Sequence, residues 1–318
     1  MSDNEKPMAI EVKNLRKAFG SKIAVNNLSF QVPEGSITGF IGPNGAGKTT
    51  TLRMLCTLLK PDAGTVKVFG LDTRDSAEKI RHQLGFMPDY FGLYDDMEVY
   101  EYLNFFAAAY HIGAHRRKNL VEDILQLLDL TAKKHSLINE LSRGMQQRLS
   151  LGRALVHDPK LLLLDEPASG LDPRARMELM ELLRELRRMG KTVFISSHIL
   201  AELKNLCDFV VIIENGRKVY NGTVADAATT VEGDLSRLQI TSSEDAQVIV
   251  DTIASWKSDL KTTIKEEKVT VVEYHSEELK SSEIISHLIK NDLHIEEAKK
   301  LLANLEDVFM SLTKGGIS

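Results

Sequence analysis

The chain is poor in the features that mark secreted, nucleic-acid-binding and membrane-spanning proteins. Its 318 residues include only two cysteines, Cys56 and Cys207, which lie far apart and favour small core residues of a reduced, cytosolic protein. No run reaches the roughly 20 apolar residues that span a bilayer. Residues 1–6 are polar and lack the apolar segment of a secretory signal. A net charge of -5 offers no basic field to DNA or RNA, so we expect no nucleic-acid partner.

The chain does contain a glycine-rich segment after Ile37–Ile41, an apolar run that predicts a buried strand. The segment consists of Gly42, Pro43, Asn44, Gly45, Ala46, Gly47, Lys48, Thr49 and Thr50. It fits G-x-x-x-x-G-K-[ST], in which backbone N–H groups bind phosphate oxygens, the lysine reaches the β and γ phosphates and the threonine hydroxyl ligates Mg²⁺. The helix expected over Thr50–Leu59 would place its positive N-terminal dipole at the phosphates. These residues predict a site for ATP and Mg²⁺.

A second apolar run, Leu161–Leu164, ends in two carboxylates, Asp165 and Glu166. A P-loop protein needs a metal partner and a group that acts on water at this position. We therefore assign Asp165 to Mg²⁺, usually through water, and Glu166 to the role of general base or of the residue that positions the water. The alternative is that both residues only cap the helix that Pro167 prepares.

Three further residues stand at the ends of predicted elements. Ser142 is the expected N-cap of a helix that runs to about Val156. Asp172 precedes Pro173, which suits the first position of another helix, so Asp172 is also an expected N-cap. His198 follows an expected strand, where an isolated histidine is more often structural than functional.

The order and approximate spacing of these motifs resemble those of the ATP-binding subunits of ABC transporters. The motifs are the P-loop, the LSRGM segment that starts at Leu141, LLLLDEP, SGLD and the single histidine. The resemblance covers about Ala9 to Val224. It implies that two nucleotide-binding domains meet head to tail, with each ATP between the P-loop of one and the signature helix of the other.

The resemblance also implies residue roles. Ser142 and Gly144 would bind the γ-phosphate held by the partner, as a helix N-terminus allows. His198 would bind the same phosphate and hold Glu166 and the water in line. Asp172 would link the two sites, and Phe19 would stack on adenine, although an isolated phenylalanine is more often a core residue.

Two positions depart from the family pattern. Asp89 stands where the family places a glutamine that contacts Mg²⁺; a carboxylate can ligate the metal but, when ionised, cannot donate a hydrogen bond to water. Arg143 and Met145 replace the first Gly and the Gln of the common LSGGQ signature, while Gly144 is retained. We expect a competent ATPase with altered or slow turnover.

The predicted fold class is α/β. Residues 8–225 should form a P-loop core with a parallel sheet, a flanking antiparallel β subdomain that includes Leu28, Phe30 and Val32, and a helical subdomain over Asp95–Asn139. Residues 235–318 should form an accessory domain with the order β-α-β-β-α-β, which suggests a ferredoxin-like sandwich with a regulatory or dimer-stabilising role. A last helix with Leu305 and Leu312 on one stripe should end the chain.

We therefore predict an ATP-hydrolysing subunit of a membrane exporter on the inner, cytoplasmic face of the cell membrane. Its expected partners are a separate transmembrane permease subunit and a second ATPase subunit, identical or different. One alternative is a soluble ABC-type switch, although the single P-loop and the lack of heptad runs count against it. Another is an ATP sensor with weak turnover. The transported substrate would be selected by the permease.

Overall fold

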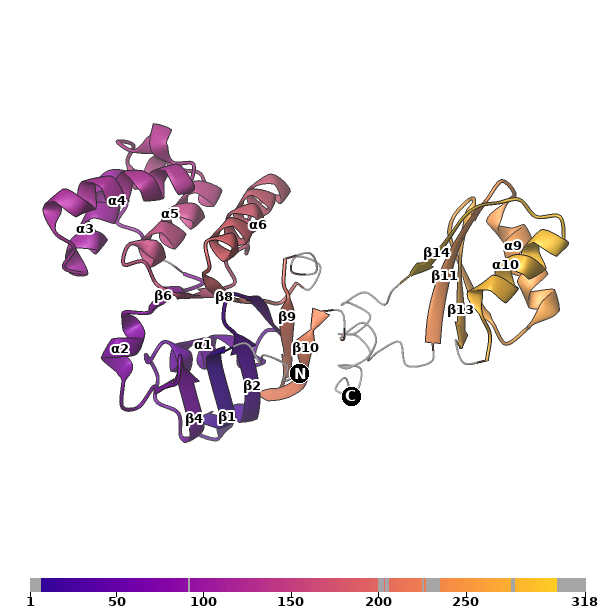
Figure 1. Ribbon diagram of the computed structural model, residues 1–318, viewed down its shortest axis with the longest axis horizontal. Coiled ribbons are helices and arrows are strands. Elements are labelled where there is room, and N and C mark those ends of the chain that lie inside the picture. Colours follow the sequence, from indigo (N-terminus) through magenta and orange to yellow (C-terminus); the bar gives the residue numbers. More distant parts are fainter. Residues whose placement is uncertain are drawn as a thin grey trace, which may run out of the picture. The chain divides into compact units, whose positions relative to one another are not determined.

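The computed structural model places the helices and strands in two units, Met1–Thr223 and Val224–Ser318. It describes residues 7–90, 92–199, 203, 206–224, 226, 235–275 and 278–301 (Figure 1). Among these residues, no helix is long and apolar enough to cross a membrane.

A six-stranded sheet forms the centre of the first unit. Its order is β10-β9-β3-β8-β7-β6. The strands are β3 (Ile37–Ile41), β6 (Leu84–Met87), β7 (Leu161–Asp165), β8 (Thr192–Ser197), β9 (Phe209–Glu214) and β10 (Arg217–Thr223). All pairs are parallel except β9–β10, whose turn at Asn215 and Gly216 has positive φ at both residues, as a type I′ hairpin requires. Every position of β3, β7 and β8 is buried, because both faces of a parallel sheet are covered.

The parallel pairing decides where the motifs meet. β3 pairs with β8, and β8 pairs with β7, so their carboxyl ends lie at one edge of the sheet. The P-loop follows β3, Glu166 follows β7 and His198 follows β8. Side chains that are far apart in sequence therefore converge at that edge, where ligands bind in open α/β sheets.

An antiparallel sheet flanks this core, as predicted. It has the order β2-β1-β4-β5 and contains β1 (Met8–Phe19), β2 (Lys22–Pro33), β4 (Ala63–Val68) and β5 (Leu71–Asp72). Phe30 of β2 stacks on Phe194 of β8 with ring centroids 5.7 Å apart, and Phe40 of β3 packs against both rings. This aromatic cluster fixes the small sheet against the central one.

Helix α1 (Lys48–Leu55) is shorter than the sequence predicted. The expected end at Leu59 is wrong because Thr57 adopts a left-handed conformation, with φ 61°, and the N–H groups of Leu58 and Leu59 both bond to Arg53. The turn still directs Leu59 onto the core, which preserves the apolar spacing that suggested a longer helix. A short helix, α2 (Ala77–Arg81), follows β5.

The helical subdomain contains α3 (Val99–Ala109), α4 (Ala114–Leu127) and α5 (Arg143–Leu155), with single 3-10 turns at Thr131–Lys133 and Ile138–Glu140. The buried residues of α3 and α4 lie on one face of each helix, and the two helices pack against each other. Helix α6 (Pro173–Arg188) packs against α5 and β8. Its N-cap is Asp172, and that of α5 is Ser142, both as predicted.

The second unit has the predicted element order. Its elements are β11 (Leu235–Ser242), α9 (Ala246–Trp256), β12 (Lys261–Glu266), β13 (Val269–His275), α10 (Ser281–Lys290) and β14 (Ile295–Leu301). The antiparallel sheet runs β12-β13-β11-β14, the arrangement of a ferredoxin-like sandwich. Both helices contribute to one core with Ile240 and Val272. The expected last helix at Leu305–Leu312 lies outside the described residues. Of residues 226–234, which separate the two predicted domains, only Asp226 is described.

Candidate nucleotide-binding site

The P-loop turns from β3 into α1 through two tightly packed glycines. A Cβ at Gly42 would lie 2.5 Å from the Ile213 carbonyl oxygen, and one at Gly47 would lie 2.5 Å from that of Ala24. Gly47 also has φ 103° as the N-cap of α1, a conformation that side chains disfavour. The first N–H groups of α1 therefore lie at the end of the loop without intrahelical partners, as an anion-binding site requires.

A hollow of about 330 Å³ opens at this helix end. Its lining comprises Phe19, Lys22, Ala24, Asn44, Gly45, Gly47, Lys48, Thr49, Thr50, Asp89 and Glu166. The lining thus combines most of the P-loop with Phe19, the aromatic residue assigned to adenine, and with Glu166, the carboxylate assigned to water. Phe19 is 53% exposed, so it is not a core residue.

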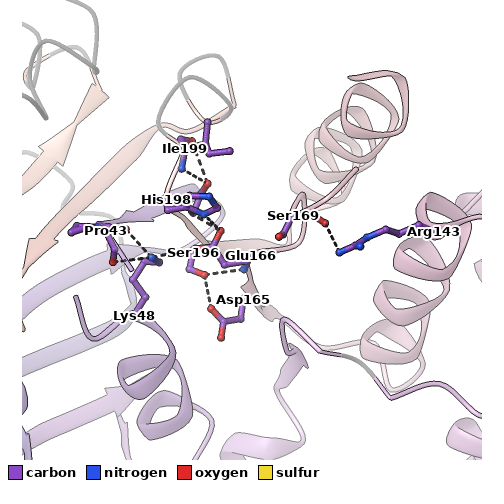
Figure 2. A network of polar contacts seen from close by, with 11 residues as sticks. Pro43, Lys48, Arg143, Asp165, Glu166, Ser169, Ser196, His198 and Ile199 are labelled. Carbon is purple, nitrogen blue, oxygen red and sulfur yellow. Dashed lines mark hydrogen bonds and ion pairs between the residues drawn. The ribbon is translucent and has the colours of Figure 1, made fainter. Parts of the chain in front are cut away.

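Glu166 connects the P-loop to the histidine after β8 (Figure 2). One carboxylate oxygen, Oε1, lies 3.2 Å from the Lys48 ammonium, which is 6% exposed and also donates to the carbonyl of Gly42 at 2.7 Å. The other oxygen, Oε2, accepts a hydrogen bond from Nδ1 of His198 at 2.8 Å. A carboxylate can only accept, so Nδ1 carries the proton. The sequence assigned these three residues to one site, and the structure places them in contact.

The backbone of Glu166 is held in a conformation that is uncommon for this residue type. Its φ is 49°, in the left-handed region, which costs roughly 1–2 kcal/mol for a residue with a Cβ. The Glu166 N–H donates to Oγ of Ser196 at 3.0 Å, and the same hydroxyl donates to Oδ1 of Asp165 at 2.6 Å. Asp165 is 1% exposed and does not line the hollow. Ser196 therefore fixes both assigned carboxylate residues.

Asp89 lies in an electrostatically negative environment. Partial burial raises the pKa of the Asp89 carboxyl above its usual value, and the charges of Asp165 and Glu166 raise it further, against the opposing effects of Arg143 and His198. A divalent cation would relieve this repulsion. The Thr49 hydroxyl lines the same hollow, so the available ligands are hard oxygen atoms, which suit Mg²⁺.

The oxygen ligands of the hollow are few. No group of three or more His, Cys, Asp or Glu residues in the described ranges could hold a metal ion. Mg²⁺ usually binds through one or two carboxylates together with substrate phosphates and water, rather than in an all-protein cage. The residues present therefore fit Mg²⁺ bound together with a nucleotide.

The three residues assigned to contacts with a partner subunit, Ser142, Gly144 and Asp172, do not line the hollow. The Ser142 hydroxyl accepts from the N–H of Met145, and the Asp172 carboxylate accepts from that of Ala175 at 2.9 Å. A Cβ at Gly144 would lie 2.9 Å from Cβ of Ala175, so this glycine allows α5 and α6 to approach each other. Within the chain, these residues act as two helix caps and one packing contact.

The sequence interpretation missed three residues around the hollow. Lys22 and Ala24 line it, and Ser196 fixes the two carboxylates. Lys22 could have been placed from the hairpin in which it pairs with Phe19. Ser196 pairs in register with Asp165 on the neighbouring strand, but that register is visible only once the strand order is known.

Comparison with known proteins gives a uniform result. A family model described as ABC transporter matches residues 25–169. The chain is 44% identical over 213 residues to the Nod factor export ATP-binding protein I of Burkholderia lata, covering 67% of this chain and 70% of that protein. It is 30% identical over 305 residues to the linearmycin resistance ATP-binding protein LnrL of Bacillus subtilis, covering 96% and 98%.

Solved structures give the same picture. An ATP-binding subunit of an ABC transporter matches with a TM-score of 0.63 and 31% identity, covering 70% of this chain and 92% of that one. The cbiO1 protein of Clostridium perfringens, described as part of the ABC transporter complex cbiONQ, matches with a TM-score of 0.65 and 25% identity, covering 71% and 95%.

Proposed function

The chain belongs to the ABC transporter family as an ATP-binding subunit, and from this premise we propose that it hydrolyses ATP to ADP and phosphate to power a membrane exporter. The names of the two relatives, one for Nod factor export and one for linearmycin resistance, support export as the direction. The subunit would act on the inner face of the membrane beside a transmembrane permease. That permease would select the cargo.

The observation that carries the proposal is the contact of Glu166 with both Lys48 and His198 at the edge of the P-loop hollow. Lys48 and the first N–H groups of α1 would bind the phosphates. Thr49 and Asp89, which line the hollow, would hold Mg²⁺ there, and Asp165, which does not line it, would act through a water molecule. The ion would neutralise phosphate charge when bound. With Lys48 bound to phosphate, the Glu166 carboxylate is released from its ion pair and can take a proton from water as general base.

His198 orients this base. Its Nδ1 proton is used in the bond to Glu166, so any hydrogen bond that the ring donates to a phosphate must come from Nε2.

The remaining assigned residues would act between subunits. Ser142 and Gly144 stand at the N-terminus of α5, and Asp172 stands at that of α6. None of the three lines the hollow of its own chain, which supports a role at the nucleotide of a partner subunit. ATP would then close the dimer, and hydrolysis would reopen it. The second unit would regulate or stabilise this dimer.

Nucleotide binding and phosphate release by the purified full chain test the proposal. Lys48→Ala should abolish tight ATP binding, because it removes a charge-assisted contact to phosphate. Lys67→Ala, a change at an exposed lysine of β4, is the matched control and should bind ATP like the parent. Equal ATP affinity in all three proteins would contradict the proposal. Binding without measurable phosphate release would instead indicate an ATP sensor.

A further inference from the structure

Two side chains of α5 donate hydrogen bonds to the loop that follows Glu166. Nη2 of Arg143 lies 3.1 Å from the carbonyl oxygen of Ser169 (Figure 2). Nε2 of Gln147 donates to the carbonyl of Pro167. Arg143 and Gln147 are four residues apart in the helix and so lie on one face, one turn apart. Their two acceptors are separated by a single residue of the loop.

The buried position of Gln147 is unfavourable for the free energy of folding. It is 2% exposed, and its Oε1 has no hydrogen-bond partner among the described residues. A buried amide with an unpaired oxygen is less favourable than an apolar side chain of the same volume. Packing alone therefore does not explain this glutamine, whereas the bond from its Nε2 to Pro167 does.

Gly170 leaves space beside the loop for the side chain of Arg143. Gly170 has φ 68°, and a Cβ at this position would lie 2.6 Å from Cζ and Nη2 of Arg143. The guanidinium group thus occupies the space that a side chain at residue 170 would need. Arg143, which is larger than the glycine of the common signature, therefore packs against Gly170 of the loop.

The loop held in this way is short and begins at the strained residue. The N–H of Ser169 donates back to the carbonyl of Glu166 at 3.0 Å, which closes a tight turn. Glu166 itself has a left-handed backbone, and such conformations persist where the surroundings fix them. The Ser196 hydroxyl holds the backbone N–H of Glu166, and α5 holds the turn that follows Glu166.

We propose that Arg143 and Gln147 are positioning residues, which we call the α5 clamp, that set the Glu166 carboxylate by holding the turn of residues 166–170. The proposal rests on the proposed function, since it concerns the base of that reaction. It also assigns a role to Arg143, one of the two residues by which this signature departs from its common form. The clamp acts within one chain, and neither residue lines the nucleotide hollow. The charge of Arg143 does act on Asp89, which lines it, so turnover is compared at saturating Mg²⁺.

Steady-state ATP hydrolysis by the full chain is the first test. Arg143→Ala should lower kcat by about three- to tenfold, the range for loss of one exposed charge-assisted hydrogen bond, with KM for ATP unchanged. Arg143→Lys keeps a charged donor and should recover most of kcat. Combining Arg143→Ala with Gln147→Met should lower kcat by less than the product of the single effects, because both residues hold one turn.

Gly170→Ala should also break the bond from Arg143 to Ser169, because the added methyl group displaces the guanidinium of Arg143. It should reproduce the kinetics of Arg143→Ala. The matched control is Gly35→Ala: Gly35 has φ 67°, almost the value at Gly170, but a Cβ there meets nothing within 4 Å. This control carries the same backbone strain without the displacement and should keep the parent kcat.

Amide hydrogen exchange makes the test independent of turnover. Arg143→Ala and Gly170→Ala should speed exchange at Ser169 and Leu171, whereas Gly35→Ala should not. Parental exchange in the first two variants, or a rise in KM for ATP with unchanged kcat, would overturn the clamp. If the parent protein shows no hydrolysis, the proposed function fails, and the exchange data still decide whether the clamp holds the turn.

Discussion

Glu166 meets Lys48 through one carboxylate oxygen, His198 through the other and Ser196 through its backbone N–H. These contacts come from three strand ends that the central sheet places side by side. The motifs assigned Lys48, Glu166 and His198 to one site, and the structure brings them into contact, because each residue stands at a fixed position after a strand. They could not identify Ser196, whose role depends on its register with Asp165.

Asp89 offers a prediction at the residue scale. Its carboxylate shares a negative environment with Asp165 and Glu166, so metal binding should depend steeply on Mg²⁺ concentration. Asp89→Gln removes the charge and restores a hydrogen-bond donor for water. We expect this variant to hydrolyse ATP at least as fast as the parent and at lower Mg²⁺, and Asp89→Ala to be slower than both. An Mg²⁺ titration that gives one requirement for all three proteins would place Asp89 away from the metal.

At the scale of single elements, the sequence predicted the capped starts of α5 and α6 better than the end of α1. Ser142 and Asp172 were recognisable as N-caps because serine and aspartate side chains readily accept a bond from the first turn of a helix, and in both cases the N–H three residues ahead donates it. The end of α1 was missed, because nothing in the sequence of Thr57 announces its left-handed backbone.

Two substitutions of Asp172 can separate its role as the N-cap of α6 from its proposed role between subunits. Asp172→Ala removes the acceptor for the Ala175 N–H and should destabilise the first unit by about 1 kcal/mol, whereas Asp172→Asn keeps a good cap and should not. Thermal unfolding of both variants measures this difference. If Asp172→Asn retains stability but loses ATP hydrolysis, the carboxylate also acts between subunits. If both variants unfold like the parent, the cap contributes nothing.

At the scale of the whole molecule, the chain consists of two units with separate cores. The element order of the second unit was predictable, because its strands and helices show distinct periods of apolar residues. The contacts of the α5 clamp were not predictable, since they join residues that only the packing of α5 against α6 brings together. Contacts with partner subunits cannot be predicted from local sequence patterns either.

The separate cores predict independent folding of the first unit. A chain that ends after Asp226 keeps every residue of the hollow and should fold and bind ATP, with altered dimerisation or coupling. Trp256, the single tryptophan, belongs to the second unit and stacks on His287 with ring centroids 4.3 Å apart. In the full chain, its fluorescence should therefore follow unfolding of that unit alone. Loss of structure or of ATP binding in the shortened chain would show that the two units depend on each other.

Hydrolysis by the Glu166→Gln variant tests the central claim most directly. The amide keeps the shape of the side chain but cannot act as a base, so phosphate release should fall by at least about 10²-fold while ATP binding persists. An ATP-bound dimer should accumulate, and Glu78→Gln, an exposed change on α2, should behave like the parent. Turnover by Glu166→Gln close to that of the parent would contradict the assignment of Glu166 as the general base.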